Sequence, residues 1–301
     1  MLISLEHAKK LIEEGRVLHI AADESLLEQL PKGKWIAGTT PYFITDQGGI
    51  TCKDKLFVNE IGCAADYKIM VYDRENILDI TKDAYSNGIT FLIMPYASDV
   101  AIHYAKEAPN SDDLLMNPTV GWISGFDLSS GSSAKVYDGS SGKSYGDKAV
   151  ALHICLSDDK IAALGIVNIF NVNENDAIIE FTEDKLSVTK CLVNGKEMFL
   201  SDYIAENNID TKVPLVADYN GTLINVSIKS VSMENKTVDL YASVFSGKQY
   251  RFASPVNDMK QALRSICGSL RTSARYFPAT AYLTISTADL KANPRRRSPV
   301  R

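Results

Sequence analysis

Apolar and polar positions in the first 126 residues follow helical spacing and strand spacing in turn. A first helix is predicted behind Ser4, because apolar residues recur on one helical face as far as Gly15. The short apolar runs that follow, each bounded by turn residues, predict strands. These strands cover residues 17–21, 35–37, 42–44, 56–61, 67–72, 89–94 and 119–126, and further helices cover residues 24–30, 74–85 and 98–105. Such a succession is typical of an α/β protein.

From residue 148 onward the pattern is mostly strand. Val150, Leu152 and Ile154 fall on one face of the first strand, and Asn194-Gly195 is a strong signal for a tight hairpin turn. Further strands are predicted over residues 161–169, 177–181, 185–193, 213–218, 222–231, 237–243 and 248–252, with one helix near residues 200–207. The chain is therefore expected to have an α/β fold, with an α+β tendency in its second half. Two mixed, largely antiparallel sheets should be flanked by helices.

A polar segment separates the two halves. Residues 127–147 are rich in serine, glycine and lysine and hold one short apolar piece, Ala134 to Tyr137. Polar Gly/Ser stretches seldom pack as core, so this segment is the predicted connection. The expected division is an α/β region over 1–126, the connecting segment 127–147, a β-rich region over 148–268 and a basic tail over 269–301.

Composition narrows the function classes. The 301 residues are 45% hydrophobic and 23% charged, which is ordinary for a globular protein of one or two packed units. The net charge of −5 disfavours nucleic acid as a partner, since binding to phosphates needs a basic surface. No apolar stretch approaches 18 residues and no secretion leader is visible, so no membrane association is predicted and the expected compartment is the cytoplasm.

The cysteines and histidines give no sign of a metal site. Five cysteines are scattered without any CxxC pair, a distribution typical of reduced core thiols in the cytosol. His153 and Cys155 share a strand face, but two ligands do not make a zinc site. We therefore predict no metal and no cofactor.

The best candidate for ligand chemistry begins at a strand end. The segment from Gly38 to Tyr42 offers two hydroxyls, a mobile glycine and an aromatic wall. The alternative is a strand with a bulge, which a glycine within a strand often marks. A second candidate lies around Trp122 and Asp127, where adjacent strand ends would line one cleft and the loop from Ser129 would be its lid. Its alternative is a hairpin shoulder with a solvated loop. The predicted ligand-binding residues are Gly38, Thr39, Thr40, Tyr42, Trp122, Ser124 and Asp127.

Catalytic motifs are weak. Gly139-Ser140-Ser141-Gly142-Lys143-Ser144 imitates a phosphate loop, but Tyr137 stands where the first glycine belongs and a strand is predicted downstream. No G-x-S-x-G elbow occurs. Cys63 at a turn is a candidate nucleophile, and a structural thiol is the alternative. A ligand-binding role is therefore favoured over an enzyme. A hydrolase or transferase of unrecognised type and a scaffold or oligomerisation module stay open.

A family resemblance rests on a succession of features in the second half. They are Gly125 before Ser132-Ser133, Asp138-Gly139, the strand over 148–156, Val188-Thr189 before Val193-Asn194-Gly195-Lys196, Tyr203, Val213-Pro214-Leu215-Val216, and Gly247 before Tyr250-Arg251. This succession resembles the C-terminal region of the FIST family. In the first half, residues 36–40 (Ile-Ala-Gly-Thr-Thr) are similar to that family's N-terminal "isoleucine-glycine-cysteine-threonine-threonine" segment, with Ala37 and Pro41-Tyr42 as departures.

The resemblance implies an intracellular sensory module. FIST domains are regarded as signal-transduction domains that bind small ligands, amino acids being the suggested class. A small molecule and a signalling protein would then be the partners. The tail over 269–301 departs from the family, because it is polar and ends in Arg295-Arg296-Arg297. It is predicted to be disordered, an expression scar or translated out of frame, and the alternative is an electrostatic tether to RNA or lipid.

Overall fold

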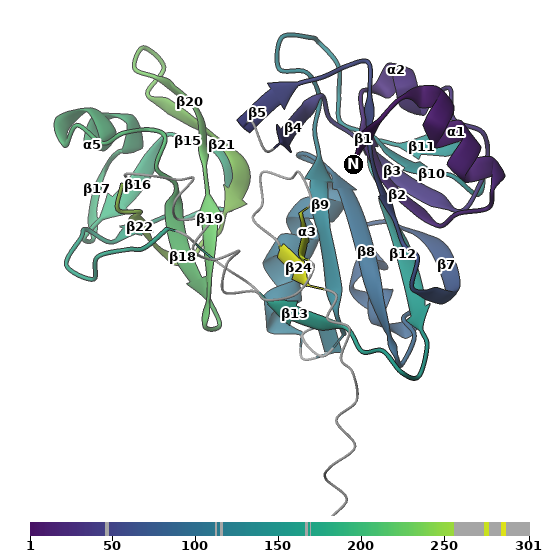
Figure 1. Cartoon of the computed structure of the whole chain (residues 1–301). Helices are drawn as coiled ribbons and strands as arrows, with labels where there is room; N and C mark the ends of the chain where they lie inside the picture. The colour runs from purple at the N-terminus through teal and green to yellow at the C-terminus, as the bar shows by residue number, and fades with distance from the viewer. Residues whose placement is uncertain are drawn as a thin grey trace, which may run out of the picture.

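The computed structural model forms two lobes that lie side by side (Figure 1). It describes residues 1–45, 48–111, 113–114, 117–165, 168, 170–255, 274–276 and 284–286. The first lobe contains residues 1–156, and the sheets of the second lobe lie within residues 179–252. The mixed α/β class predicted from the sequence is confirmed.

The first lobe holds a six-stranded mixed sheet. Its strands are, in order, β1 (Leu2–Ile3), β6 (Leu56–Glu60), β2 (Leu18–Ala22), β3 (Trp35–Thr39), β10 (Val136–Asp138) and β11 (Lys143–Tyr145). Within it β2 and β3 run parallel, and the other pairs are antiparallel. A separate hairpin of β4 (Tyr42–Thr45) and β5 (Gly48–Thr51) follows β3.

A four-stranded sheet packs against the first one. Its strands are, in order, β7 (Ala64–Tyr72), β12 (Ala149–Leu156), β8 (Gly88–Pro95) and β9 (Thr119–Ser124), with β8 and β9 parallel. The predicted alternation in β12 is confirmed, because Val150, Leu152 and Ile154 all point into the core between the two sheets. That shared core buries the facing sides of the central strands of both sheets.

Helices cover the two outer faces. On the first sheet, α1 (Leu5–Glu13) and α2 (Glu24–Leu27) enclose a core that includes Leu18 and Trp35. On the second sheet, α3 (Asp99–Glu107) and the 3₁₀ helices η1 (Ile77–Lys82) and η2 (Ala108–Asn110) follow one another, and α3 and η1 enclose a third core. The first lobe is therefore a helix–sheet–sheet–helix sandwich. The predicted cap of α1 is confirmed, since the Ser4 side chain accepts a hydrogen bond from the His7 N–H.

The second lobe is built from two further sheets around one core. The larger has the order β17 (Lys196–Phe199), β16 (Lys190–Val193), β14 (Ile179–Glu180), β22 (Gln249–Phe252), β18 (Leu215–Tyr219) and β19 (Thr222–Val226). The smaller has the order β15 (Lys185–Val188), β21 (Thr237–Val244) and β20 (Ile228–Ser232), and α5 (Leu200–Glu206) follows β17. Asn194 and Gly195 both adopt positive φ, 49° and 79°, so the predicted tight turn is confirmed.

The helix predicted over residues 74–85 is wrong. Only the six residues of η1 are helical in this segment, as a 3₁₀ turn. The Asp73 N–H donates to the Asn76 side chain, and the Asn76 N–H donates back to the Asp73 carboxylate. Such a reciprocal pair is the arrangement that begins a helix, so the prediction found a helical segment here but gave it the wrong length and type.

The predicted connecting segment 127–147 contributes two strands to the first lobe. β10 pairs with β3, and β11 completes that sheet as a hairpin with β10. β12, assigned to the second region by its sequence pattern, pairs instead with β7 and β8 of the first lobe. The first sandwich therefore extends through Leu156. Val136 pairs with Gly38, 98 positions away, and Val150 pairs with Val71 and Ile93, 79 and 57 positions away. No local pattern reports pairings at such separations.

The predicted basic tail lies mostly outside the described residues. Two short pieces of it, β23 (Ala274–Tyr276) and β24 (Thr284–Ser286), form a small antiparallel sheet with β13 (Ala163–Gly165). Within the described parts of the chain, every helix is too short or too polar to cross a membrane.

Candidate ligand-binding site

The predicted site residues meet where the parallel strands of both sheets end. β2 and β3 end side by side at Ala22 and Thr39, and β8 and β9 end at Pro95 and Ser124. The two pairs touch directly, because the Gly125 N–H donates to the Thr39 carbonyl oxygen at 2.7 Å. Ligands of open α/β sheets bind outside the carboxyl ends of the strands, so this end is the place to look for a site.

Thr39 belongs to the structural joint between the sheets. Its hydroxyl donates to the Gly125 carbonyl at 2.6 Å and accepts from the Lys135 N–H at 2.9 Å. Its neighbour Thr40 accepts from the Tyr42 N–H at 3.2 Å, and both threonines are buried. These hydroxyls therefore hold three chain segments together and are not presented to solvent.

Gly38, Trp122 and Ser124 form the buried side of the joint. A Cβ at Gly38 would lie 2.8 to 3.0 Å from atoms of Ile93, Trp122 and Ser124, so the absent side chain lets the two sheets approach. The Trp122 indole N–H donates to Nε2 of His19 at 3.0 Å. Burial lowers the pKa of His19 to about 3, which keeps the ring neutral and able to accept this bond.

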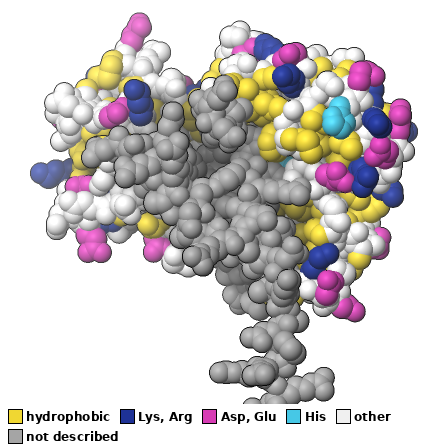
Figure 2. Space-filling view, viewed as in Figure 1, with side chains coloured by type: hydrophobic (Ala, Val, Ile, Leu, Met, Phe, Trp, Pro, Cys, Tyr) yellow, Lys and Arg dark blue, Asp and Glu magenta, His cyan; other side chains and the backbone are white. Residues whose placement is uncertain are grey.

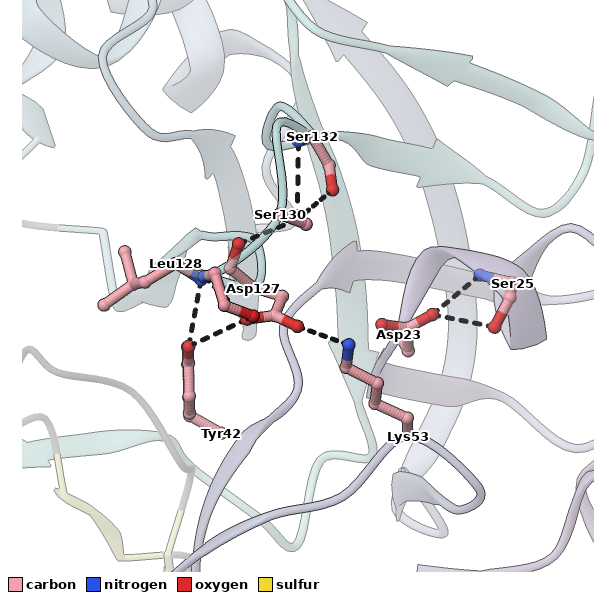
Figure 3. A network of polar contacts seen from close by, with 9 residues as sticks. Asp23, Ser25, Tyr42, Lys53, Asp127, Leu128, Ser130 and Ser132 are labelled. Atoms are coloured by element: carbon pink, nitrogen blue, oxygen red, sulfur yellow. Dashed lines mark hydrogen bonds and ion pairs between the residues drawn. The ribbon is translucent and has the colours of Figure 1, made fainter.

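The exposed side of the joint centres on Asp127 (Figure 3). Its carboxylate forms an ion pair with Lys53 and accepts hydrogen bonds from the N–H and hydroxyl of Ser129, at 2.9 and 2.7 Å. The hydrogen bond from Lys53, followed by those from Ser129, holds the Asp127 pKa well below its usual range. Asp127 is therefore a fixed negative charge at the strand end.

Tyr42 and Leu128 place apolar surface beside this charge. The Tyr42 hydroxyl accepts from the Leu128 N–H at 3.0 Å and lies 3.5 Å from the Asp127 carboxylate. The Tyr42 residue is 39% exposed and Leu128 is 51% exposed. A pinned aromatic ring and a free aliphatic side chain next to an ion pair are the materials from which small-molecule sites are built.

Lys53 and Asp23 complete the group, and the sequence analysis missed both of them, as it missed Leu128. Figure 3 shows the Lys53 ammonium between the carboxylates of Asp127 and Asp23. The hydrogen bond to Asp127 is the largest cause of the raised Lys53 pKa, and the field of Asp23 adds to it. Asp23 caps α2 by accepting from the Ser25 N–H at 3.1 Å. Asp23 follows a buried strand, as Asp127 does. This shared position after a strand is the feature of the sequence from which Asp23 could have been predicted. We call Asp23, Tyr42, Lys53, Asp127 and Leu128 the strand-end cluster.

The serine-rich loop predicted as a lid is fastened to the cluster. The Ser130 N–H and hydroxyl both donate to the Asp127 carbonyl, at 2.9 and 2.7 Å. The Ser132 N–H donates to the Ser130 hydroxyl at 3.4 Å. The position of this loop is thus tied to the position of Asp127, and its role as a lid stays a prediction.

The phosphate-loop lookalike is a hairpin turn whose donors are already used. The Asp138 carboxylate accepts from the N–H and hydroxyl of Ser140, at 2.8 and 2.6 Å, and from the Ser141 hydroxyl at 2.6 Å. The turn leads into β11, which the sequence pattern did not predict, and then into the predicted strand β12, so no helix N-terminus follows. The donors that a phosphate would need at Ser140 and Ser141 are bonded to a carboxylate of the protein.

We expect Asp138→Ala to lower the free energy of unfolding by about 1 to 3 kcal/mol, because a buried carboxylate with several donors is removed. Urea unfolding at neutral pH measures it. Asp147→Ala, at an exposed position of the same segment, is the control and should change little. An Asp138→Ala protein as stable as the parent would show that the turn does not depend on this carboxylate.

A second polar chain is buried on the outer face of the second sheet. The Tyr72 hydroxyl donates to the Asp83 carboxylate at 2.8 Å, so its oxygen accepts from Nε2 of His153 at 2.9 Å. Nδ1 of His153 then accepts from the Thr90 hydroxyl at 2.8 Å. Burial lowers the His153 pKa to about 4, in agreement with a neutral ring. His153 is therefore a hydrogen-bonded core histidine.

Charge on the visible face is mixed. Figure 2 shows lysine and arginine side chains of the first lobe interspersed with aspartate and glutamate. Such a surface lacks the single-sign field that steers nucleic acid toward a protein. Among the residues that the structure describes, no three side chains of histidine, cysteine, aspartate or glutamate lie together in a group that could hold a metal ion.

The fold and the cluster define an α/β protein with a charged site at the carboxyl ends of its parallel strands. The sequence profile of the DUF6976 family, a family of unknown function, matches residues 3–287, so the chain belongs to this family. The match includes residues 269–287 of the predicted tail. No curated protein and no solved structure matches the chain. The resemblance to the FIST family stays a prediction.

Proposed function

We propose that the protein binds a small ligand at the strand-end cluster, as a cytoplasmic sensory or binding module. The observation that carries this proposal is that four separate segments of the chain meet at one end of the sandwich. They contribute residues 23, 42, 53, 127 and 128. The compartment is supported by Cys52 and Cys191, which are buried free thiols of the kind that a reducing environment maintains.

The chemistry of the cluster favours a ligand with both charged and apolar parts. The Lys53 side chain is half exposed, and its ammonium can donate hydrogen bonds to an anionic group of the ligand. Asp23 offers the opposite charge, while Tyr42 and Leu128 offer apolar contact. Amino acids and small organic acids fit this description, and amino acids are also the class that the FIST resemblance implies. A signalling protein as the second partner belongs to the same proposal.

We expect one or more amino acids or organic acids to raise the melting temperature of the full chain, with a shift that grows as the logarithm of ligand concentration. A thermal-shift screen of amino acids, organic acids and nucleotides measures it. Lys53→Met should raise the dissociation constant of a ligand found in the screen by about tenfold or more, because it removes a charged hydrogen-bond donor.

The control is Lys190→Met, which removes a lysine of similar exposure from its ion pair with Glu197 in the second lobe. It should leave the shift unchanged. A hit that Lys53→Met and Asp127→Asn both leave intact would place the ligand elsewhere. A screen without any saturable shift would defeat the proposal.

A further inference from the structure

The turn between β8 and α3 is held in an unusual conformation. Ala97 has φ of +60°, in the left-handed region that non-glycine residues seldom adopt. Ser98 secures the turn, because its hydroxyl donates to the Pro95 carbonyl at 2.7 Å and accepts from the Ala101 N–H at 3.3 Å. Backbone strain persists only where the surroundings over-determine it, so this turn is a rigid connector.

Tyr96, in the same turn, bridges the two lobes. Its N–H donates to the Ser124 carbonyl of β9 at 3.0 Å. Its hydroxyl donates to the Leu240 carbonyl of β21 in the second lobe at 3.1 Å. The Lys229 ammonium of β20 lies 5.6 Å from the centroid of its ring. Burial, and then the nearby Asp239 carboxylate, raise the Tyr96 pKa, so the hydroxyl keeps the proton that it donates.

Tyr96 also contacts the residue that precedes the strand-end cluster residue Asp127. The Tyr96 ring and the Phe126 ring have centroids 6.3 Å apart, and Phe126 directly precedes Asp127. The helix that starts at this turn makes a second contact between the lobes, because Lys106 pairs with Asp184 at 2.5 Å. The cluster and the second lobe therefore share one packed connection through Phe126 and Tyr96.

We propose that Tyr96 couples the strand-end cluster to the second lobe. A change in the loop over residues 125–132 alters the contact between Phe126 and Tyr96, and Tyr96 transmits it to β20 and β21. The biological role of this coupling rests on the proposed function, because the coupling would carry the effect of ligand binding from the cluster to the second lobe. The coupling itself belongs to the chain without ligand, since its contacts are internal, and coupling between two sites acts in both directions.

The experiment is amide hydrogen exchange over residues 228–244 in four full-length proteins: the parent, Asp127→Asn, Tyr96→Phe and the double variant. Tyr96→Phe removes the bond to Leu240 and should speed exchange of this segment about fivefold. Asp127→Asn, which acts from a distance, should speed it about threefold in the parent. In the Tyr96→Phe protein it should add nothing, because the connection is already broken.

Glu6→Gln is the control, since it removes a carboxylate from the exposed ion pair with Lys9 on α1. It should leave exchange over 228–244 unchanged. The coupling is overturned if Asp127→Asn has no effect on this segment, or if the factors of the two variants simply multiply. No ligand is present in this experiment, so its failure is distinct from a failed ligand screen.

Discussion

Acidification from pH 7.5 to pH 4.5 is expected to lower the free energy of unfolding by about 5 kcal/mol through two buried histidines. The folded chain lowers the pKa of His19 to about 3 and of His153 to about 4, chiefly by burial. In the unfolded chain both rings titrate near pH 6.5. The unfolded state therefore binds more protons below pH 6.5. Stability is complete above that pH and is lost as the pH falls toward the folded values.

Burial explains why neither ring accepts a proton readily in the folded chain, because the charged ring would lose its hydration. A hydrogen bond adds to this at His19: Nε2 accepts from the Trp122 indole N–H, so protonation would set two donors against each other. Nδ1 of His153 accepts from the Thr90 hydroxyl, which can turn and accept instead, so burial is the main cause there. The stability that is lost equals the free energy of protonating both rings in the unfolded chain, which the folded chain does not gain.

Urea unfolding at several pH values between 7.5 and 4.5 measures this dependence. His19→Gln and His153→Gln should each remove about half of the pH slope, while each lowers stability at neutral pH. The exposed His7 on α1 supplies the control, because His7→Gln should leave the slope unchanged. A slope that both core variants leave intact would assign the acid sensitivity to carboxylates instead.

Gly38→Val is expected to destabilise the protein by about 3 kcal/mol, the upper part of the usual range for overpacking. The new side chain would meet Ile93, Trp122 and the stiff Cβ of Ser124, all of them in the packed layer between the sheets. Strand β3 would have to move away from β9, and the bond from Gly125 to Thr39 would be strained. Thermal or urea unfolding measures the loss.

Gly125→Ala is the matched control from the same joint, because a Cβ at Gly125 meets nothing within 4 Å. It should cost little. The comparison also tests the division of the predicted site into a buried joint and an exposed cluster. If Gly38→Val were tolerated, open space would exist beside Trp122, and a ligand cavity inside the joint would become the better hypothesis.

The division into a buried joint and an exposed cluster changes the role assigned to the predicted ligand-binding residues. Gly38, Thr39, Trp122 and Ser124 are buried and join the two sheets, whereas Tyr42 is 39% exposed and the Asp127 side chain is partly exposed at 12%. Sequence reasoning brought the two segments together because both follow apolar strands. It could not distinguish the residues buried in the joint from those exposed at the surface, since burial of a strand residue depends on the sheet that packs against it.

By itself the sequence determined the local elements of this protein. The cap at Ser4, the turn at Asn194-Gly195 and the inward face of β12 all follow from side chains within a few residues of one another. The mixed α/β class followed from the same short-range patterns. The helix over 74–85 was mispredicted in length and type, since a six-residue 3₁₀ helix stands there.

Only the tertiary structure decided where those elements lie. It placed β10 beside β3 and β12 between β7 and β8, and it brought Lys53 to Asp127 across 74 positions of the chain. These contacts are stabilised by burial of apolar side chains between the sheets, which is non-directional and does not specify which strand pairs with which. The strand-end cluster exists because two parallel strand pairs end at the same edge of one sandwich.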